Sequence, residues 1–170
     1  MESKYSGLLT QFQRKQRDQK SSVHGSGLFA FENISKGTKI IEYVGDKVTK
    51  KEGDSRADKQ LNKAKKNRNN GMVYVFELNK HYDIDGGVVY NHARLINHSC
   101  NPNCEVEISN NQIWISAIKN IKKNAELTYN YGYPYDADYV DHLCECGSYK
   151  CVGYILDEDH WPKLKKKRKN

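Results

Sequence analysis

The 170-residue sequence has no long hydrophobic run. A membrane-spanning helix needs about 20 consecutive apolar residues, and no segment approaches that length. The first twenty residues are polar and contain no apolar stretch of the kind found in signal peptides. No internal repeat is present. We therefore expect a soluble, intracellular protein without membrane contact, long enough to form one domain with a small buried core.

The chain has an odd number of cysteines, five, and three of them lie in the eight residues from Cys144 to Cys151. An odd and crowded set suits a disulfide framework poorly and metal binding better, particularly in a reducing compartment. The run CxCxxxxC, with Cys146 at its centre, supplies three thiolates from a tight loop, whereas a structural zinc site needs four ligands. The fourth ligand must come from elsewhere in the chain: Cys100, Cys104 or His142.

Acidic residues are missing from the stretch Lys163–Lys169 (KLKKKRK), which carries six positive charges. Since the net charge of the whole chain is +7, the remainder is close to neutral. A basic tail favours acidic partners such as nucleic acid, or a nuclear import receptor. A solvated, disordered chain end is the alternative interpretation. Either way, residues 157–170 are predicted to form a basic tail outside the folded domain.

Short segments rich in β-branched and aromatic residues recur along the chain, separated by turn signals such as Asp85-Gly86-Gly87. They predict five strands, at Lys39–Val44, Met72–Leu78, Glu105–Ile108, Gln112–Ile118 and Ala125–Tyr131. This pattern is typical of a mostly β fold with short helices, an α+β protein in which irregular loops join small sheets.

The stretch 46–70 contains few large apolar residues and many Lys, Asn and Asp. Ala57, Leu61 and Ala64 recur at helical spacing, which predicts a short surface helix with a thin apolar stripe, capped by Asp54 or Ser55. We interpret this stretch as an insert between two strands. The N-terminal residues 1–21 are expected to form a helical or flexible segment.

Two glycines flank one residue in His24-Gly25-Ser26-Gly27. Without Cβ atoms, such a backbone can approach a ligand closely, although most short glycine pairs are simple turns. The third glycine of a dinucleotide-binding loop is missing. This motif is therefore a weak ligand-binding signal when it is considered alone.

Two further motifs gather polar groups. Asn97 and His98 follow an apolar pair and offer amide and imidazole hydrogen bonds to a charged small molecule, although a lone histidine is more often structural. In the run Glu126–Tyr133 (ELTYNYGY), alternation places Tyr129 and Tyr131 on one face of a strand. Core packing with a solvated hydroxyl is the alternative interpretation for either tyrosine.

Along the chain the four motifs follow one another as the glycine pair, the Asn97 motif, the Tyr131 motif and the cysteine run. In that order they resemble the SET-domain lysine methyltransferases that carry a post-SET zinc module. The most specific pieces are Asn97-His98-Ser99-Cys100-x-Pro102-Asn103, Glu126-Leu127-Thr128-Tyr129-x-Tyr131 and the CxCxxxxC run. The resemblance implies SET-domain β-sheets with a pseudoknot, followed by a small post-SET zinc loop. The implied organisation is a SET domain over 22–133 with a variable insert at about 46–70, a zinc module over 140–156, and the tail.

The resemblance also implies roles for individual residues. Tyr131 would be the active-site tyrosine, Tyr43 would line the lysine channel, and Tyr129 would limit the number of methyl groups added. The cofactor S-adenosylmethionine would be bound by His24, Gly25, Ser26, Gly27, Tyr74, Arg94, Asn97, His98 and Tyr131. Zn²⁺ would be held by Cys100, Cys144, Cys146 and Cys151, which leaves Cys104 outside the site.

The implied activity is N-methylation of a lysine in a histone tail or another basic protein, with mono- or dimethylation as the product. The rival interpretations are a catalytically silent SET module that binds peptide or nucleic acid, and a nucleic-acid-binding zinc protein. The implied location is the nucleus or chromatin, or a host nucleus if the source is a bacterium or a virus.

Overall fold

The computed structural model of the protein describes residues 17–21, 23, 25–66 and 73–167. These residues divide into two compact units. The first unit is built from Lys39–Leu95 and Val106–Ser116, and the second from the described residues of Gln16–Thr38, Ile96–Glu105 and Ala117–Asn170. Both units are therefore discontinuous in sequence.

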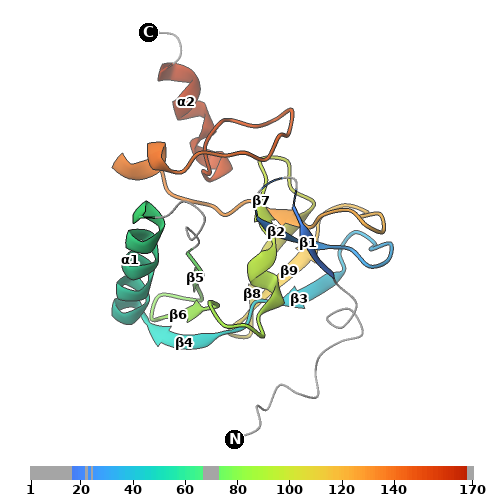
Figure 1. Ribbon diagram of the computed structural model, residues 1–170, viewed down its shortest axis with the longest axis horizontal. Helices are drawn as coiled ribbons and strands as arrows, with labels where there is room; N and C mark the ends of the chain where they lie inside the picture. The colour runs from blue at the N-terminus through green and yellow to red at the C-terminus, as the bar shows by residue number, and fades with distance from the viewer. Residues whose placement is uncertain (1–16, 22, 24, 67–72, 168–170) are drawn as a thin grey trace, which may run out of the picture. The chain divides into compact units, whose positions relative to one another are not determined.

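The first unit contains most of one three-stranded sheet and the whole of another (Figure 1). The strands of the former are β3 (Lys39–Glu42), β9 (Gln112–Ala117) and β8 (Cys104–Ser109), with β9 in the middle and antiparallel to β3. Those of the latter are β4 (Asp46–Thr49), β6 (Tyr82–Asp85) and β5 (Val75–Glu77), with β6 in the middle and antiparallel to both neighbours. The core of this unit is aliphatic and includes Ile40, Ile41, Ile113 and Ile115.

Helix α1 (Lys50–Lys66) packs along β6 and β4 (Figure 1). It begins before the cap predicted at Asp54 or Ser55, and that prediction is wrong. The Glu52 amide instead donates to the hydroxyl of Thr49 at 3.4 Å, so the helix starts at a Thr-x-x-Glu capping motif. Gly53 disfavours helix locally, yet it is buried, and a Cβ there would meet the side chain of Asp83. The glycine therefore allows the helix to approach β6 closely.

The second unit contains two short sheets. Strand β1 (Arg17–Lys20) pairs antiparallel with β2 (Ser26–Phe29), and β7 (Asn97–His98) pairs in parallel with β10 (Thr128–Tyr129). The core of this unit includes Leu28, Ile96, Leu127 and Leu156, each at most 1 % exposed. The parallel pairing brings the Asn97 segment against the Tyr131 segment, as the resemblance implied; the threading of a pseudoknot stays a prediction.

Short helices complete both units. The 3₁₀ helix η2 (His92–Leu95) belongs to the first unit, and η3 (Ala137–Asp141) and η4 (Glu158–His160) belong to the second. Helix α2 (Trp161–Lys167) follows η4 directly, so residues 161–167 are helical rather than a disordered chain end. The indole N–H of Trp161 donates to the carbonyl of Leu156 at 3.3 Å, which anchors the start of this helix to the unit's core.

The predicted class, mostly β with short helices, is confirmed. Of the predicted strands, those beginning at Lys39 and Gln112 match well, whereas the last shortens to Thr128–Tyr129 and Met72 lies outside the described residues. Strands β2, β4, β6 and β7 were not predicted, since each is only two to four residues long and several are polar. Residues 17–20 form a strand rather than the expected helical or flexible segment, and 1–16 lie outside the described residues.

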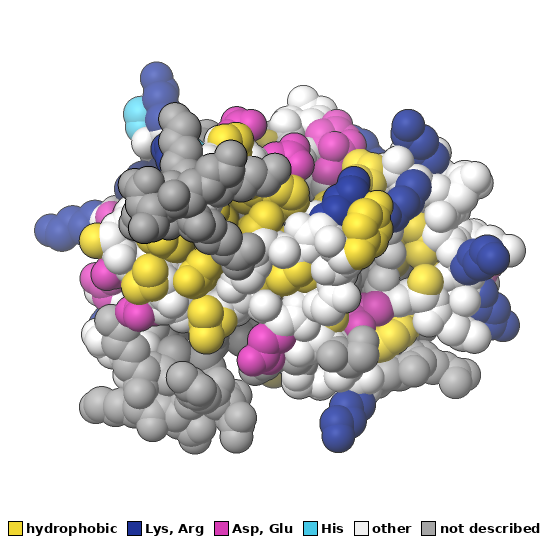
Figure 2. Space-filling view, turned by 90° about the horizontal axis from the view of Figure 1, so that it is seen from above, with side chains coloured by type: hydrophobic (Ala, Val, Ile, Leu, Met, Phe, Trp, Pro, Cys, Tyr) yellow, Lys and Arg dark blue, Asp and Glu magenta, His cyan; other side chains and the backbone are white. Residues whose placement is uncertain are grey.

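Charged side chains are distributed over the surface. On the face seen in Figure 2, the described Lys and Arg side chains stand singly or in small groups, interspersed with acidic and apolar side chains. Among the helices that the structure describes, none has the length and apolar character that crossing a bilayer demands.

Candidate active site and metal centre

Asn97, in β7 of the second unit, is 3 % exposed and lies at the centre of a hydrogen-bond cluster. Its amide nitrogen donates to the Glu126 carboxylate at 2.8 Å, to the Ser21 hydroxyl at 3.0 Å and to the Ser26 carbonyl at 3.2 Å. The Ser21 hydroxyl donates to the same carboxylate oxygen of Glu126 at 2.6 Å. Three segments far apart in sequence therefore converge on one amide group.

The two glycines of the first motif have different surroundings. Gly25 has a φ of 52°, and a Cβ built there would meet no atom within 4 Å. A Cβ on Gly27 would collide with the carboxylate of Glu126. Gly27 is therefore needed for packing against Glu126, whereas Gly25 is needed for its left-handed backbone. His24 lies outside the described residues.

Tyr131 follows β10 and is held at both ends by the Asn97 segment. Its hydroxyl donates to the carbonyl of Ile96 at 3.0 Å, and its backbone N–H donates to Nδ1 of His98 at 3.2 Å. The rings of His98 and Tyr131 meet edge to face, with centroids 5.5 Å apart. The two motifs that the sequence singled out for chemistry are thus brought together within one unit.

Aromatic rings line up next to Tyr131. The ring centroid of Tyr129 lies 5.0 Å from that of Tyr131, and the ring centroid of Tyr133 lies 6.0 Å from that of Tyr131. Tyr129 is 7 % exposed, and burial raises the pKa of the Tyr133 phenol. The expected proximity of Tyr129 and Tyr131 is confirmed, although Tyr131 itself lies beyond the end of the strand.

Four cysteines of the second unit form a compact cluster: Cys100, Cys144, Cys146 and Cys151. Their Sγ atoms all lie within 4.8 Å of one another, and those of Cys100 and Cys144 are 3.7 Å apart. Four thiolates at the usual Zn–S distance of about 2.3 Å from a tetrahedral zinc ion lie about 3.8 Å from one another. The cluster therefore fits Zn²⁺, and among the three candidates for the fourth ligand the geometry selects Cys100.

The thiol contacts in the cluster shift the pKa values of its members in opposite directions. The contact between the two thiols lowers the pKa of Cys100 and raises that of Cys144, and burial raises the pKa of Cys151. The fifth cysteine differs: burial raises the pKa of the Cys104 thiol to about 12. Cys104 is 1 % exposed and does not belong to the four-cysteine cluster, so it acts as a small core residue.

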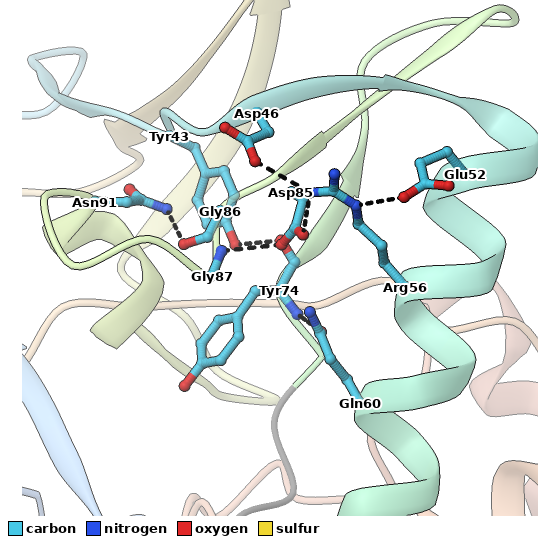
Figure 3. A network of polar contacts seen from close by, with 10 residues as sticks. All are labelled: Tyr43, Asp46, Glu52, Arg56, Gln60, Tyr74, Asp85, Gly86, Gly87 and Asn91. Carbon is cyan, nitrogen blue, oxygen red and sulfur yellow. Dashed lines mark hydrogen bonds and ion pairs between the residues drawn. The ribbon is translucent and has the colours of Figure 1, made fainter.

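In the first unit, Tyr43 directly follows β3 and is 4 % exposed. Its hydroxyl donates to the carbonyl of Tyr74 at 2.8 Å, and its ring packs against that of Phe76 with centroids 5.2 Å apart. A Cβ on Gly86 would collide with the Tyr43 ring, so this glycine makes room for the tyrosine. Figure 3 shows Tyr43 and Gly86 close together, with Asn91 donating to the Gly86 carbonyl at 3.0 Å.

Helix α1 is tied to these residues by two side chains (Figure 3). Gln60 accepts a hydrogen bond from the Tyr74 N–H at 2.8 Å, so both polar groups of the Tyr74 backbone are paired. The guanidinium group of Arg56 is shared among three carboxylates, those of Glu52 at 2.9 Å, Asp46 at 3.1 Å and Asp85 at 2.9 Å. The insert is therefore fastened to the sheet on the side that carries Tyr74.

Arg94, in η2, has an incomplete set of partners. Its guanidinium group lies over the Tyr74 ring, 5.6 Å from the centroid. Its Nε is buried and has no hydrogen-bond partner among the described residues. Because a buried N–H without an acceptor is unfavourable, the site calls for a polar or anionic ligand group. The carboxylate of S-adenosylmethionine is an acceptor of this kind, and its contact with Arg94 stays a prediction.

Sequence reasoning missed three residues of the second unit: Ser21, Asn103 and Glu126. The Asn103 side chain donates to the Glu126 carbonyl at 2.7 Å and accepts from the Thr128 N–H at 2.9 Å, so it links the two motifs. Asn103 is the last residue of the Asn97 motif and Glu126 is the first residue of the Tyr131 motif. Membership of these motifs was the one sequence feature that pointed to a role for the two residues. Nothing in the sequence around Ser21 indicates its role.

The comparisons with known proteins agree with this geometry. The family model of the SET domain matches residues 25–132, which is more than half of the chain. The protein belongs to the SET-domain family, and the resemblance drawn from the motifs is confirmed.

Its relatives include histone-lysine N-methyltransferases. The protein set-2 of Caenorhabditis elegans is 36 % identical over 140 residues, which cover 80 % of this chain and 9 % of the relative. The H3 lysine-4 specific enzyme of Aspergillus oryzae is 38 % identical over 145 residues, which cover 80 % of this chain and 11 % of the relative. Histone-lysine N-methyltransferase 2D of Homo sapiens is 33 % identical over 153 residues, covering 88 % and 3 %. The chain thus spans only a small part of these much longer proteins.

Proposed function

We propose that the protein is an S-adenosylmethionine-dependent protein-lysine N-methyltransferase that acts on a histone tail or another basic protein. The observation that carries this proposal is the double anchoring of Tyr131, by the Ile96 carbonyl and by His98, to the segment that carries the buried Asn97. A phenol fixed in this way can orient a small nucleophile with little loss of freedom during reaction.

S-Adenosylmethionine, when bound, supplies a methyl group on a positively charged sulfur. The substrate lysine must present a neutral amine, although a free lysine has a pKa of about 10.4. An apolar, aromatic channel disfavours the ammonium form and so lowers that pKa. The lone pair of the neutral amine would form the new N–C bond as the C–S bond of the cofactor breaks, and the proton of the methylated amine would pass to solvent. No dedicated side-chain base is required.

Each tyrosine has a separate role in this proposal. The Tyr131 hydroxyl orients the lysine amine, because its backbone and side chain are both anchored. Tyr43 lines the lysine channel through its buried ring. The Tyr129 hydroxyl restricts the space beside the amine, so the enzyme favours monomethylation, with dimethylation as the slower step.

For the cofactor, the second unit supplies Asn97, the His98 backbone and the loop of Gly25, Ser26 and Gly27, with His24 as the resemblance implies. The resemblance also implies cofactor contacts by Tyr74 and Arg94. The buried Arg94 Nε supports this assignment. Zn²⁺ is held by the four clustered cysteines and supplies structural cross-linking between the loop that follows Asn97 and the C-terminal residues 144–151.

The substrate is a chromatin protein in this proposal, and the site of action is the nucleus. Relatives that are named H3 lysine-4 specific make the N-terminal tail of histone H3 the first substrate to test. The basic residues at the end of α2 and beyond it add an accessory contact with nucleic acid. That contact predicts binding that weakens steeply with salt and that is lost when Lys163–Lys169 is removed.

The test is methyl transfer from isotopically labelled cofactor to histones and other basic proteins, with the modified lysine located by mass spectrometry. We expect label on a lysine with the wild-type protein and a large loss of label with Tyr131→Phe. A rival interpretation, a silent module that only binds peptide, predicts substrate binding without label in either protein. A nucleic-acid-binding zinc protein predicts no dependence on Tyr131.

A further inference from the structure

The side chain of His98 is 4 % exposed and uses both ring nitrogens within the protein. Nδ1 lies 3.2 Å from the backbone nitrogen of Tyr131, which donates to it. Nε2 lies 3.5 Å from the Sγ atom of Cys100. The ring is thus inserted between the residue proposed to orient the lysine and one of the four cysteines of the zinc cluster.

These two contacts determine which nitrogen carries the proton. A backbone N–H can only donate, so Nδ1 must accept and must be unprotonated. In a neutral imidazole the proton then sits on Nε2, which points to Cys100. An Nε2–H group next to a zinc-bound thiolate donates a charge-assisted hydrogen bond to sulfur. The two hydrogen bonds therefore run in one direction: Tyr131 donates to His98, and His98 donates to Cys100.

Each of the two contacts constrains a different part of the site. Tyr131 is fixed by His98 at its backbone and by the Ile96 carbonyl at its hydroxyl, 3.0 Å away. Cys100 is fixed in the cluster, with its Sγ 3.7 Å from that of Cys144. Through these two contacts, a displacement of Cys100 would be transmitted to the imidazole and from it to the Tyr131 backbone.

We propose that His98 is a positioning residue that couples the zinc cluster to Tyr131, through Nε2–H to the Cys100 thiolate and Nδ1 to the Tyr131 N–H. In this proposal both ring nitrogens are used within the protein, so the cofactor contact of His98 is made by its backbone. We call the two hydrogen bonds of His98, to Cys100 and to Tyr131, the His98 bridge. The functional importance of Tyr131 rests on the proposed methyltransferase activity, whereas the existence of the His98 bridge does not.

Outer hydrogen bonds to metal ligands commonly contribute a factor of about 10 to 100 in metal affinity. His98→Asn keeps an acceptor in the place of Nδ1 and lacks the donor toward Cys100, so we expect zinc affinity to fall by about 10-fold or more. His98→Gln can bring an amide N–H to the place of Nε2, and we expect it to retain most of the zinc affinity. His81→Asn, at an exposed histidine of the first unit, is the matched control.

The experiment combines zinc competition against a chromophoric chelator with ¹⁵N NMR of the histidine rings in the zinc-loaded 170-residue chain. We expect the Nε2–H tautomer for His98, and a changed His98 ring spectrum when zinc is removed. A ring protonated on Nδ1, or equal zinc affinities for wild type and His98→Asn, would overturn the proposal. The NMR measurement needs no variant, so a substitution that prevents folding does not remove the test.

Neither readout requires methyl transfer. If the expected tautomer and zinc affinities are found in a protein without methyltransferase activity, the proposed function fails and the bridge stands. If activity is found with the opposite tautomer, the bridge fails and the proposed function stands. In an active enzyme, His98→Gln should lower kcat more than it raises the KM for the cofactor, since the Tyr131 contact is the one it loses.

Discussion

The amide nitrogen of Asn97 donates to the carboxylate of Glu126 at 2.8 Å, although the two residues lie 29 positions apart in the sequence. That carboxylate also fills the space next to Gly27, where a Cβ atom would collide with it. The position of the Asn97 amide therefore depends on Gly27 of the glycine motif and on Glu126, the first residue of the Tyr131 motif. This dependence leads to a prediction that concerns packing rather than chemistry.

Gly27→Ala should weaken cofactor binding. The added methyl group displaces the Glu126 carboxylate and so disturbs the Asn97 amide. A lost hydrogen bond to a charged group costs about 1.5–3 kcal/mol, so we expect roughly a tenfold or larger rise in the Kd for S-adenosylmethionine, measured by calorimetry. Gly37→Ala is the control for backbone strain: with a φ of 83° it should lower stability, but its Cβ would meet no atom within 4 Å, so the Kd should stay unchanged. Equal affinities for Gly27→Ala and wild type would contradict the prediction.

Tyr131→Phe should lower kcat by about 100-fold with a small effect on stability, since misplacement of a reacting group costs about that factor. The substitution keeps the ring and its contacts with His98 and Tyr129, and it removes only the hydroxyl that donates to Ile96. Steady-state methyl transfer and thermal unfolding are the two measurements. An unchanged kcat would exclude the phenol from catalysis.

Tyr129→Phe should change the product rather than the rate of the first transfer. Removing one buried hydroxyl enlarges the space beside the lysine amine, so the share of di- and trimethylated lysine should rise. Mass spectrometry of the modified peptide measures this share directly. The same proportion of monomethyl product in both proteins would count against the assigned role of Tyr129.

Zinc should bind with about one ion per chain, and its removal should lower both thermal stability and cofactor affinity. Cys146→Ser removes one ligand of a four-thiolate site, and we expect loss of most of the bound metal. Cys104→Ala is the matched control, because this buried thiol lies outside the cluster and its truncation costs about 1 kcal/mol while zinc is retained. Metal content is measured by atomic absorption. Full zinc content in Cys146→Ser would refute the four-cysteine site.

Arg56→Met should loosen the insert. Its guanidinium group forms ion pairs with Asp46, Glu52 and Asp85. Methionine has a similar length but no charge, so the substitution removes all three ion pairs. We expect faster amide hydrogen exchange in α1 and at Tyr74, whose N–H is held by Gln60 of the same helix. Lys63→Met, at an exposed position on α1, should leave exchange unchanged. Equal exchange in all three proteins would show that the clamp is dispensable.

The sequence predicted which motifs matter better than it predicted the strands. The motifs at Asn97 and Tyr131 are contiguous and specific, and the structure brings them together. The strands β4 and β7 were not foreseen because they are short and polar, and pairing with a partner far along the chain stabilises them more than any local preference does. The cap of α1 was misplaced because the helix already includes Gly53, at a position where close packing against Asp83 requires a glycine.

The fourth zinc ligand shows the same limit. Spacing alone left Cys100, Cys104 and His142 as alternatives, and only the folded position of Cys100 distinguishes them. The contacts of Glu126 with Asn97 and Ser21 depend on three segments that meet in space, so no local pattern could reveal them.

The most direct test of the account is calorimetric titration of the purified, zinc-loaded protein with S-adenosylmethionine. The account predicts saturable binding of about one molecule per chain, weakened when Gly27 is replaced by alanine. Absence of measurable heat or saturation in protein that contains its zinc and is folded would contradict the assignment of this SET-domain protein as a methyltransferase.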